Sequence, residues 1–267
     1  MTEIKKNKKT LWIGMILLIV LTIGFMVTNS FSSDQQKITG NVISDKEIKI
    51  ENLPVLRNNE ILPGLSASLT SLDTAKSSTI VDVADGETYT ISADIVKKEI
   101  NGQELTLYGY NGMIPGVALR VQQGSTITVI FENNIDMETT IHWHGLRHNI
   151  QDDGVPDVSQ SPVKPGESFT YELYFPDNGI FWYHPHVRED IQQDAGMAGN
   201  MLVIPKDTYN PVNREELLVL DDILLDSNGQ MIPFGKEHAN FAIMGRFGNV
   251  MLTNGKTFYD LTINKGE

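Results

Sequence analysis

Short segments of alternating apolar and polar residues, separated by turn residues, follow one another from residue 87 onward. Alternation with a period of two places apolar side chains on one face of a β-strand. No long stretch has the 3.6-residue spacing of an amphipathic helix. Short strands with Gly, Pro and Asn turns between them predict an all-β sandwich or barrel. The segments are 89–96, 105–108, 118–121, 126–131, 169–175, 180–183 and 200–205.

The N-terminus has the composition of an export signal. Four lysines at residues 5–9 precede an uncharged apolar run at 11–27, and small polar residues follow. A basic flank before an apolar stretch is typical of a signal peptide or a signal anchor. We therefore predict that residues 1–33 are a signal peptide or an N-terminal membrane anchor. The rest of the chain is then extracytoplasmic, whether secreted, periplasmic or anchored facing outside.

Three further parts are predicted after this signal. Residues 34–80 are polar with little periodicity, which indicates a linker and an irregular lead-in. The first β domain is expected over 81–206. A second unit, 214–267, repeats an Asn-Gly turn, a short strand and a Gly turn of the first. The chain reaches residue 267 where the next strand would begin, so we expect this second unit to be a truncated start of a domain.

Two features of the composition exclude classes of function. The chain has no cysteine. This excludes a disulfide, an iron–sulfur cluster, a thiol nucleophile and the thiolate-ligated blue-copper site. The formal net charge is −13. A body of that sign repels phosphate backbones, so no nucleic acid is expected as a partner.

Four of the six histidines form two His-x-His pairs, His142 with His144 and His184 with His186. Residues i and i+2 of a strand point to the same face, so each pair can present two imidazoles side by side. Two neighbouring strands could bring all four rings to one rim of a sandwich. Imidazole binds zinc, copper, iron and nickel, and the Irving–Williams order favours copper over zinc. From the ligands alone, the zinc site of a hydrolase also remains possible.

Around these pairs the sequence resembles the multicopper oxidases, laccase-like and metal-oxidising enzymes built from cupredoxin β-sandwiches. The resemblance implies a cupredoxin-like Greek-key β-sandwich, followed by an incomplete second cupredoxin-like domain. It is carried, in family order, by TIHWHGL at 140–146, DGVPDVSQ at 153–160, PGESFTY at 165–171, GIFWYHPH at 179–186 and GMAGNMLVI at 196–204.

The resemblance also implies a set of copper ligands. His142 would bind a type 2 copper, and His144, His184 and His186 would bind a type 3 pair. These are four of the eight histidines of a trinuclear cluster. Asp153 would act catalytically beside the type 2 copper, where it would hydrogen-bond water and help to deliver protons.

The family's remaining ligands and its type 1 copper belong to a C-terminal domain, and this sequence contains no His-Cys-His motif. We therefore expect the chain to be the N-terminal portion of a multicopper oxidase that needs a missing domain or another subunit. In the complete enzyme, O2 is reduced to water while a small reducing substrate or metal ion is oxidised. Alone, the chain is expected to be inactive as an oxidase.

Two alternatives stay open at this point. One is a copper-binding module without oxidase turnover, and the other is a zinc-dependent hydrolase. Some aromatic and histidine residues near the motifs are expected to have only structural roles. Trp143, Trp182 and Tyr183 are predicted to be packing residues. His148 and His238 are predicted to be surface histidines or histidines with satisfied hydrogen bonds.

Overall fold

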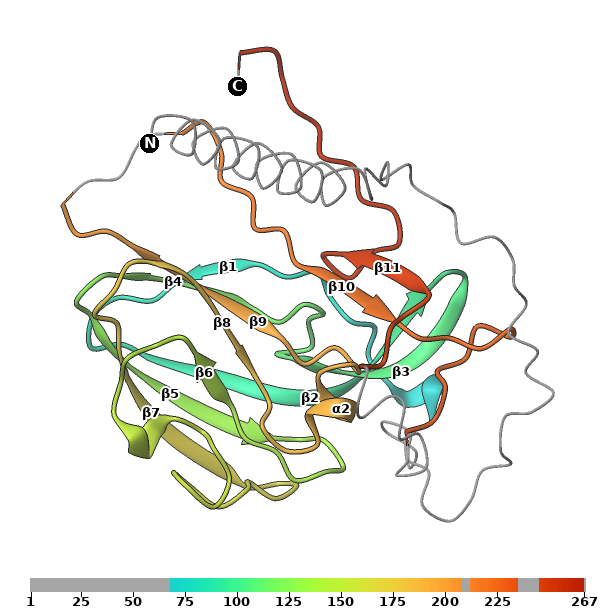
Figure 1. Ribbon diagram of the computed structural model, residues 1–267, viewed down its shortest axis with the longest axis horizontal. Coiled ribbons are helices and arrows are strands. Elements are labelled where there is room, and N and C mark those ends of the chain that lie inside the picture. The colour runs from blue at the N-terminus through green and yellow to red at the C-terminus, as the bar shows by residue number, and fades with distance from the viewer. Residues whose placement is uncertain (1–67, 208–211, 235–244, 267) are drawn as a thin grey trace, which may run out of the picture. The chain divides into compact units, whose positions relative to one another are not determined.

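The alternating segments form two β-sheets that pack face to face in the computed structural model (Figure 1). The structure describes residues 68–207, 212–234 and 245–266, all within one unit of the chain, Ile50–Glu267. The predicted export signal at 1–33 and most of the predicted lead-in lie outside the described residues. In the described part, no helix is long and apolar enough to cross a membrane.

One sheet has four strands in the order β3-β2-β5-β7. Its long second strand pairs antiparallel with β3 through its C-terminal half and parallel with β5 through its N-terminal half. Apolar side chains at alternate positions along these strands face the other sheet, as the period of two requires. The strands are β2 (Thr88–Ile100), β3 (Gln103–Tyr110), β5 (Thr126–Asn133) and β7 (Ser168–Tyr174).

The other sheet has five strands in the order β1-β4-β9-β8-β6. It is mixed, because β1 and β9 both run parallel to β4, whereas β8 is antiparallel to β9 and to β6. The three-residue strand β6 lies at one edge. The strands are β1 (Ile80–Asp82), β4 (Ala118–Gln122), β6 (His142–His144), β8 (Gly179–His184) and β9 (Gly199–Ile204).

Large apolar side chains from the two sheets form the core between them. Phe131 and Tyr171 from the four-stranded sheet and Leu119 and Tyr183 from the five-stranded sheet are fully buried in one cluster. The predicted all-β sandwich is therefore confirmed. Sequence patterning did not reveal β1, since three residues beside a polar segment are too few to show alternation.

A separate two-stranded antiparallel sheet is formed by β10 (Leu220–Ile223) and β11 (Val250–Thr253). Its buried Ile223 and Leu252 pack with Val96 and Leu105 of the four-stranded sheet in a second apolar cluster. The remaining described elements are short: η2 (Leu69–Ser71), η3 (Ile150–Asp152) and α2 (Glu189–Gln192).

The predicted repeat of an Asn-Gly turn has a structural counterpart. Asn111 and Gly112 have φ angles of 54° and 67°, and Asn254 and Gly255 have φ angles of 50° and 68°. Asn and Gly are the residues that most readily adopt this left-handed conformation. The two Asn-Gly turns are thus alike, but the short strand predicted after the second one is wrong, because the described residues 254–266 form no strand. The domain boundaries proposed from the repeat stay a prediction.

The core predicts a strong dependence of stability on Phe131, which is 0% exposed. Phe131→Ala should lower the free energy of unfolding by about 3–5 kcal/mol, because it removes apolar burial and leaves a cavity. Phe258 is 87% exposed, so Phe258→Ala is a matched control that should change it by less than about 0.5 kcal/mol. Urea unfolding followed by tryptophan fluorescence measures both. Equal effects of the two substitutions would contradict this assignment of the core.

Candidate metal centre

The register between β6 and β8 places the first histidine pair beside His184. The strand β8 ends at His184, so His186, which the His-x-His spacing predicted on the same strand, lies just beyond it. His142 lies opposite His184, and Trp143 lies opposite Tyr183. Trp143 and Tyr183 are fully buried. Because adjacent residues of a strand point to opposite faces, the histidines on either side of Trp143 face away from the core. The His-Trp-His pattern therefore places Trp143 on the core face of this edge strand. Its opposite face presents the imidazoles of His142 and His144.

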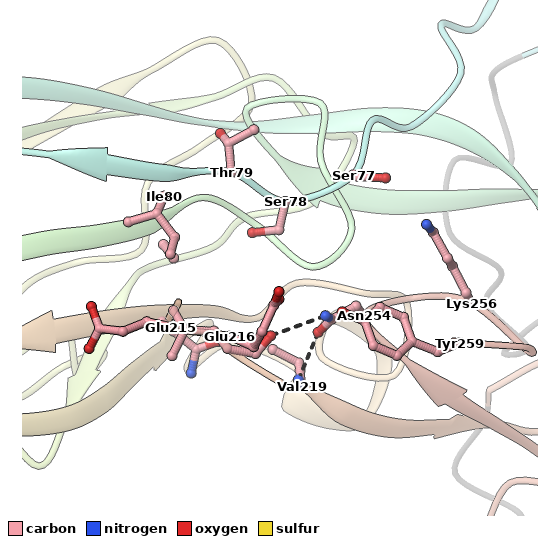
Figure 2. Close-up of a pocket in the computed structure, with 13 residues that line it drawn as sticks. Ser77, Ser78, Thr79, Ile80, Glu215, Glu216, Val219, Asn254, Lys256 and Tyr259 are labelled. Atoms are coloured by element: carbon pink, nitrogen blue, oxygen red, sulfur yellow. Dashed lines mark hydrogen bonds between the residues drawn. The ribbon is translucent and has the colours of Figure 1, made fainter. Parts of the chain in front are cut away.

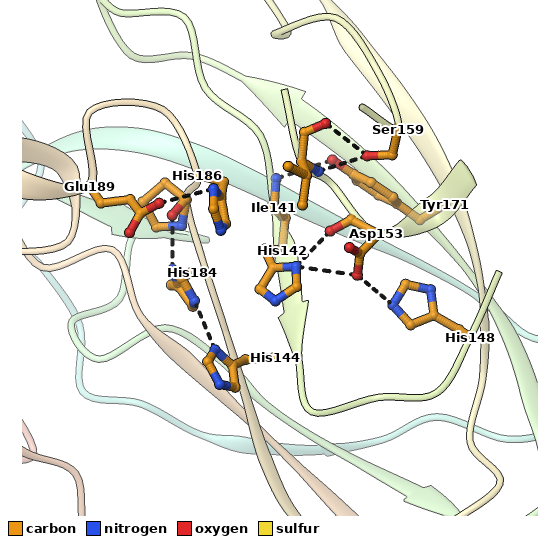
Figure 3. Close-up of polar contacts among 12 residues, drawn as sticks. Ile141, His142, His144, His148, Asp153, Ser159, Tyr171, His184, His186 and Glu189 are labelled. Atoms are coloured by element: carbon orange, nitrogen blue, oxygen red, sulfur yellow. Dashed lines mark hydrogen bonds and ion pairs between the residues drawn. The ribbon is translucent and has the colours of Figure 1, made fainter. Parts of the chain in front are cut away.

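The four imidazole rings gather within a small space (Figure 3). The His142 ring lies 5.5 Å from that of His144, 5.5 Å from that of His184 and 5.1 Å from that of His186, measured between ring centres. The rings of His184 and His186 are 5.8 Å apart. Three of these residues, His142, His144 and His184, offer ligand atoms within 4.8 Å of one another.

Hydrogen bonds to backbone carbonyls orient two of these rings. His142 Nδ1 lies 2.7 Å from the carbonyl oxygen of Asp153, and His184 Nδ1 lies 2.8 Å from that of Pro185. A carbonyl can only accept, so Nδ1 carries the proton in both rings and Nε2 keeps its lone pair. The His184 Nε2 atom lies 3.3 Å from His144 Nδ1. Two ring nitrogens that face each other in this way need a shared proton or a bridging cation.

Burial keeps His184 neutral. Its side chain is buried, and desolvation lowers the pKa of the His184 imidazole to about 4. The opposing hydrogen bond to Pro185 is the weaker effect, and the neighbouring His142 and His144 lower the pKa further. At neutral pH the ring is therefore a neutral donor, which is the form that binds metal.

Trp182 and Glu189 fix the outer rings. Trp182 stacks on His144 and His184, with ring centres 5.0 Å and 4.1 Å away. The predicted packing role of Trp182 is thus a contact with the imidazoles themselves. Glu189 Oε1, at the start of α2, lies 2.9 Å from His186 Nδ1. A carboxylate against one ring nitrogen directs the other nitrogen and raises its basicity.

Asp153 reaches His142 through a tight turn after η3. Gly154 has φ +73°, and a Cβ there would lie 1.7 Å from the carbonyl oxygen of Ile141. Only glycine lets the turn lie this close to the strand that carries His142. The Asp153 carboxylate atom Oδ1 then lies 3.4 Å from His142 Nδ1. The neighbouring Asp152 has a structural task, because its Oδ1 accepts a hydrogen bond from the Glu172 amide at 2.9 Å.

His148 differs from the prediction that it is a surface or satisfied histidine. Its side chain is 2% exposed, and neither ring nitrogen makes a hydrogen bond to any described residue. Its Nε2 lies 3.5 Å from the same Asp153 Oδ1 atom. Burial lowers the pKa of His148, against the attraction of Asp153 and Asp152. Sequence reasoning missed this residue because a lone histidine in a turn gives no periodic signal. His238 lies outside the described residues.

Known proteins are similar to part of this chain in sequence and in fold. The family profile described as Multicopper oxidase matches residues 93–208, which include all four clustered histidines and Asp153. A solved multi-copper oxidase from Pseudomonas thermotolerans is 38% identical with a TM-score of 0.58, over 67% of this chain and 42% of that one. This domain belongs to the multicopper oxidase family. Its sandwich is accordingly the predicted cupredoxin-like fold.

Two curated relatives agree with this assignment. Copper resistance protein A of Pseudomonas syringae pv. tomato is 31% identical over 147 residues, 55% of this chain and 24% of its own length. Laccase-1 of Cryptococcus neoformans var. grubii is 34% identical over 127 residues, 46% of this chain and 20% of its own length. The chain thus spans about a quarter of the length of the curated relatives it matches.

The donor set fits the metal of a multicopper oxidase. Imidazole nitrogens suit copper, and copper exceeds zinc in affinity at such sites. His142 and His184 are held as the Nδ1–H tautomer by carbonyl oxygens. His184 Nε2, which then carries a lone pair, lies 3.3 Å from His144 Nδ1. A copper site at this rim therefore agrees with the neutral, pre-oriented rings.

Helix α2 connects the histidine motif to the second apolar cluster. The fully buried Gln192 accepts a hydrogen bond from Thr139 at 2.7 Å and donates one to the Glu138 carbonyl at 2.8 Å. Ile191 is buried beside Phe234. The loop after His186 is therefore fixed on both sides, toward β6 and toward β10 and β11.

An ion pair continues this connection. Arg246 Nε lies 3.4 Å from Asp194 Oδ2, and the Arg246 guanidinium lies 3.7 Å above the Phe234 ring. Arg246 also donates to the carbonyl oxygens of Ile232 and Pro233. No sequence signal links Asp194 to Arg246, because they are far apart in the chain and occur in segments without a motif.

A cavity of about 300 Å³ lies elsewhere, between the start of β1 and the Asn254 turn (Figure 2). Ser78, Glu216 and Lys256 are among its lining residues, and it shares none with the histidine cluster. Asn254 closes one side by accepting from the Val219 amide at 2.8 Å and donating to the Leu217 carbonyl at 3.0 Å. These bonds hold the turn against the segment before β10, at a distance from the metal centre in the fold.

Gly154 should be the most sensitive glycine of the site. Gly154→Ala should lower the free energy of unfolding by more than about 2 kcal/mol, because strain at positive φ adds to the overlap with Ile141. Gly166 also has a positive φ, 80°, but a Cβ there would meet nothing within 4 Å. Gly166→Ala should therefore cost only about 1 kcal/mol. Chemical unfolding compares them, and a similar loss for both would show that the turn does not need this close approach.

Asp194 should make stability depend on pH. Burial raises the pKa of Asp194 to about 7, against the opposing effect of Arg246. A carboxyl with a raised pKa favours the folded state at low pH, and this contribution is lost as pH rises from about 4 through 7. Asp194→Asn should thus become more stable relative to the unaltered chain between pH 5 and pH 8. Its side chain is 36% exposed, so solvent screening reduces the effect and we predict only its sign.

Melting temperatures of the two proteins across this pH range measure the difference. Asp177 is the matched control, because its pairing with Arg147 lowers the pKa of Asp177. Asp177→Asn should not gain stability relative to the unaltered chain over the same range. A difference between Asp194→Asn and the unaltered chain that stays constant with pH would contradict the raised pKa.

Proposed function

We propose that this chain supplies part of a copper cluster at which O2 is reduced to water while a small reducing substrate or metal ion is oxidised. One observation carries the proposal. At one rim of a multicopper oxidase domain, four imidazole rings from β6, β8 and the residues after β8 each lie 5.1–5.8 Å from at least two of the others, between ring centres. The names of the curated relatives, copper resistance protein A and laccase, agree with that chemistry.

His142 is proposed as the ligand of a type 2 copper, and His144, His184 and His186 as ligands of a type 3 pair. The position of each ring supports this division. His142 stands beside Asp153, while His144 and His184 face each other across 3.3 Å. His186 is oriented from the other side by Glu189. Bound copper would supply the one-electron redox steps and the affinity for O2.

Asp153 is proposed to transfer protons between solvent and the copper centre. Its carboxylate is 34% exposed and lies 3.4 Å from the His142 ring. A carboxylate in that place can hydrogen-bond a water and pass protons between solvent and the site. Reduction of one O2 to two waters consumes four electrons and four protons, so a defined route for protons is part of the chemistry.

The remaining parts of such an enzyme are proposed to come from another domain or subunit. The four histidines here would be four of eight cluster ligands. A thiolate-ligated type 1 copper cannot form in a chain that has no cysteine. The histidine cluster is accessible to solvent at His144, because this residue is exposed. A second set of ligands could therefore approach the rings from that side.

The chain is proposed to act outside the cytoplasm. The basic and apolar segments within residues 1–33 support export, with cleavage or with retention as a membrane anchor. No property of the described residues bears on this part of the proposal.

A second candidate function is a copper-binding module without oxidase turnover. The open side of the cluster and the absence of cysteine favour it for the chain by itself. Both candidates require copper at the same rings, and oxygen uptake with a reducing substrate separates them. A zinc-dependent hydrolase is not favoured, because the matching family profile and the similar solved structure from Pseudomonas thermotolerans are both described as multicopper oxidases.

Copper binding by the chain tests the proposal directly. The metal-free protein should bind copper, and His142→Ala and His184→Ala should each weaken binding by more than tenfold, because each removes an oriented ligand. His238→Ala is the control and should bind as the unaltered chain does. Isothermal titration and electron paramagnetic resonance of Cu(II) measure this. Binding that survives both substitutions, or a preference for zinc over copper, would refute the copper site.

A further inference from the structure

We propose that His148 is a positioning residue that holds the Asp153 carboxylate against His142. This rests on the proposed function, because Asp153 acts only if the neighbouring rings bind copper. Sequence motifs of the domain include His142 and Asp153, and His148 stands between them in the chain without belonging to either. Its place in the fold, not its place in a motif, points to this task (Figure 3).

The burial of His148 is unfavourable for stability alone. Its side chain is 2% exposed, and neither ring nitrogen has a hydrogen bond among the described residues. Burying a polar group without a partner costs about 1–3 kcal/mol. Polar groups kept in this state in a native structure call for an explanation. An apolar side chain would fill the same space at lower cost, so the imidazole must serve something else.

The nearest charged atom indicates what the imidazole serves. His148 Nε2 lies 3.5 Å from Asp153 Oδ1, and the same oxygen lies 3.4 Å from His142 Nδ1. The carboxylate oxygen therefore stands between two imidazoles. An N–H at His148 Nε2 would attract this oxygen and keep the carboxylate from turning toward water. Small movements of either side chain would bring the pair to hydrogen-bond distance.

The main chain of Asp153 is fixed by a hydrogen bond, but its carboxylate needs a separate contact to hold it in place. The carbonyl oxygen of Asp153 already accepts from His142 Nδ1 at 2.7 Å, so the main chain of the turn is fixed. The Asp153 side chain has no such restraint and keeps 34% exposure. Removing a group that orients a metal ligand changes metal affinity by about 10–100-fold, and Asp153 is placed to orient His142 in this way. His148 is placed to be such a residue for Asp153.

The test compares two substitutions in the full chain. His148→Leu removes the donor, whereas His148→Gln keeps an N–H donor of similar reach. We expect His148→Leu to weaken Cu(II) binding by about tenfold and to change the paramagnetic resonance spectrum of the bound Cu(II). Its metal-free melting temperature should not fall, because the substitution removes an unsatisfied buried group. His148→Gln should restore binding to within about threefold.

A double-substitution cycle shows whether His148 acts through Asp153. In an Asp153→Ala background, His148→Leu should have no further effect on copper binding, since coupled residues are not additive. Equal effects of His148→Leu in both backgrounds would overturn the proposal. So would copper binding by His148→Leu equal to that of the unaltered chain. If the unaltered chain shows no copper binding that depends on His142, the proposed function fails first, and this inference fails with it.

A measurement without copper gives an independent answer. Nitrogen-15 NMR of the metal-free chain should show His148 as the Nε2–H tautomer, and Asp153→Ala should shift the His148 Nε2 resonance. His148 found as the Nδ1–H tautomer would place a lone pair against the carboxylate and would overturn the proposal whatever the copper affinities.

Discussion

The pairing of β6 with β8 is the constraint on which the site depends. With His142 opposite His184, the imidazoles share one face and the indole of Trp143 and the phenol of Tyr183 share the other. A shift of one residue in this register would turn the histidines into the core and the aromatic rings into water. Burial of Trp143 and Tyr183 therefore sets the register, and the register sets the metal centre. The burial of Trp143 on one face of β6 thus determines the position of His142 and His144 on the other face.

Much of this arrangement follows from the sequence because it depends on short, local patterns. The alternation of apolar residues predicts the sandwich, and the His-x-His spacing predicts the neighbouring strands that carry His142, His144 and His184. It does not predict that β8 ends at His184 and leaves His186 beyond the strand. The Asn-Gly turns at Asn111 and Asn254 also follow, since few residues adopt their backbone angles. In each case the responsible residues lie within a few positions of one another, so the pattern is visible before folding.

What the sequence did not reveal depends on contacts between distant segments. Asp194 and Arg246 meet only because α2 packs against the segments around β10 and β11. The burial of His148 follows from the path of a turn that has no periodicity. The stacking of Trp182 on His144 requires the register that the fold supplies. Propensities and spacing carry no information on such pairs, and packing of the whole domain decides them.

The polar atoms without hydrogen bonds are instructive in their location. Seven buried side-chain polar atoms lack a hydrogen-bond partner among the described residues. Three belong to Tyr110, Asn111 and Gln160, and four lie close to His142 in the chain, namely Thr140 Oγ1, Trp143 Nε1 and both ring nitrogens of His148. Each such group opposes folding by about 1–3 kcal/mol. A segment selected for stability alone would replace them with apolar atoms of the same shape. The four near His142 indicate that their segment is held in place by the well-packed core on either side. The stability of that core allows the imidazoles and the Asp153 carboxylate at the rim to stay close together without satisfying each other's hydrogen bonds. Such an arrangement is favourable when a metal ion binds between them.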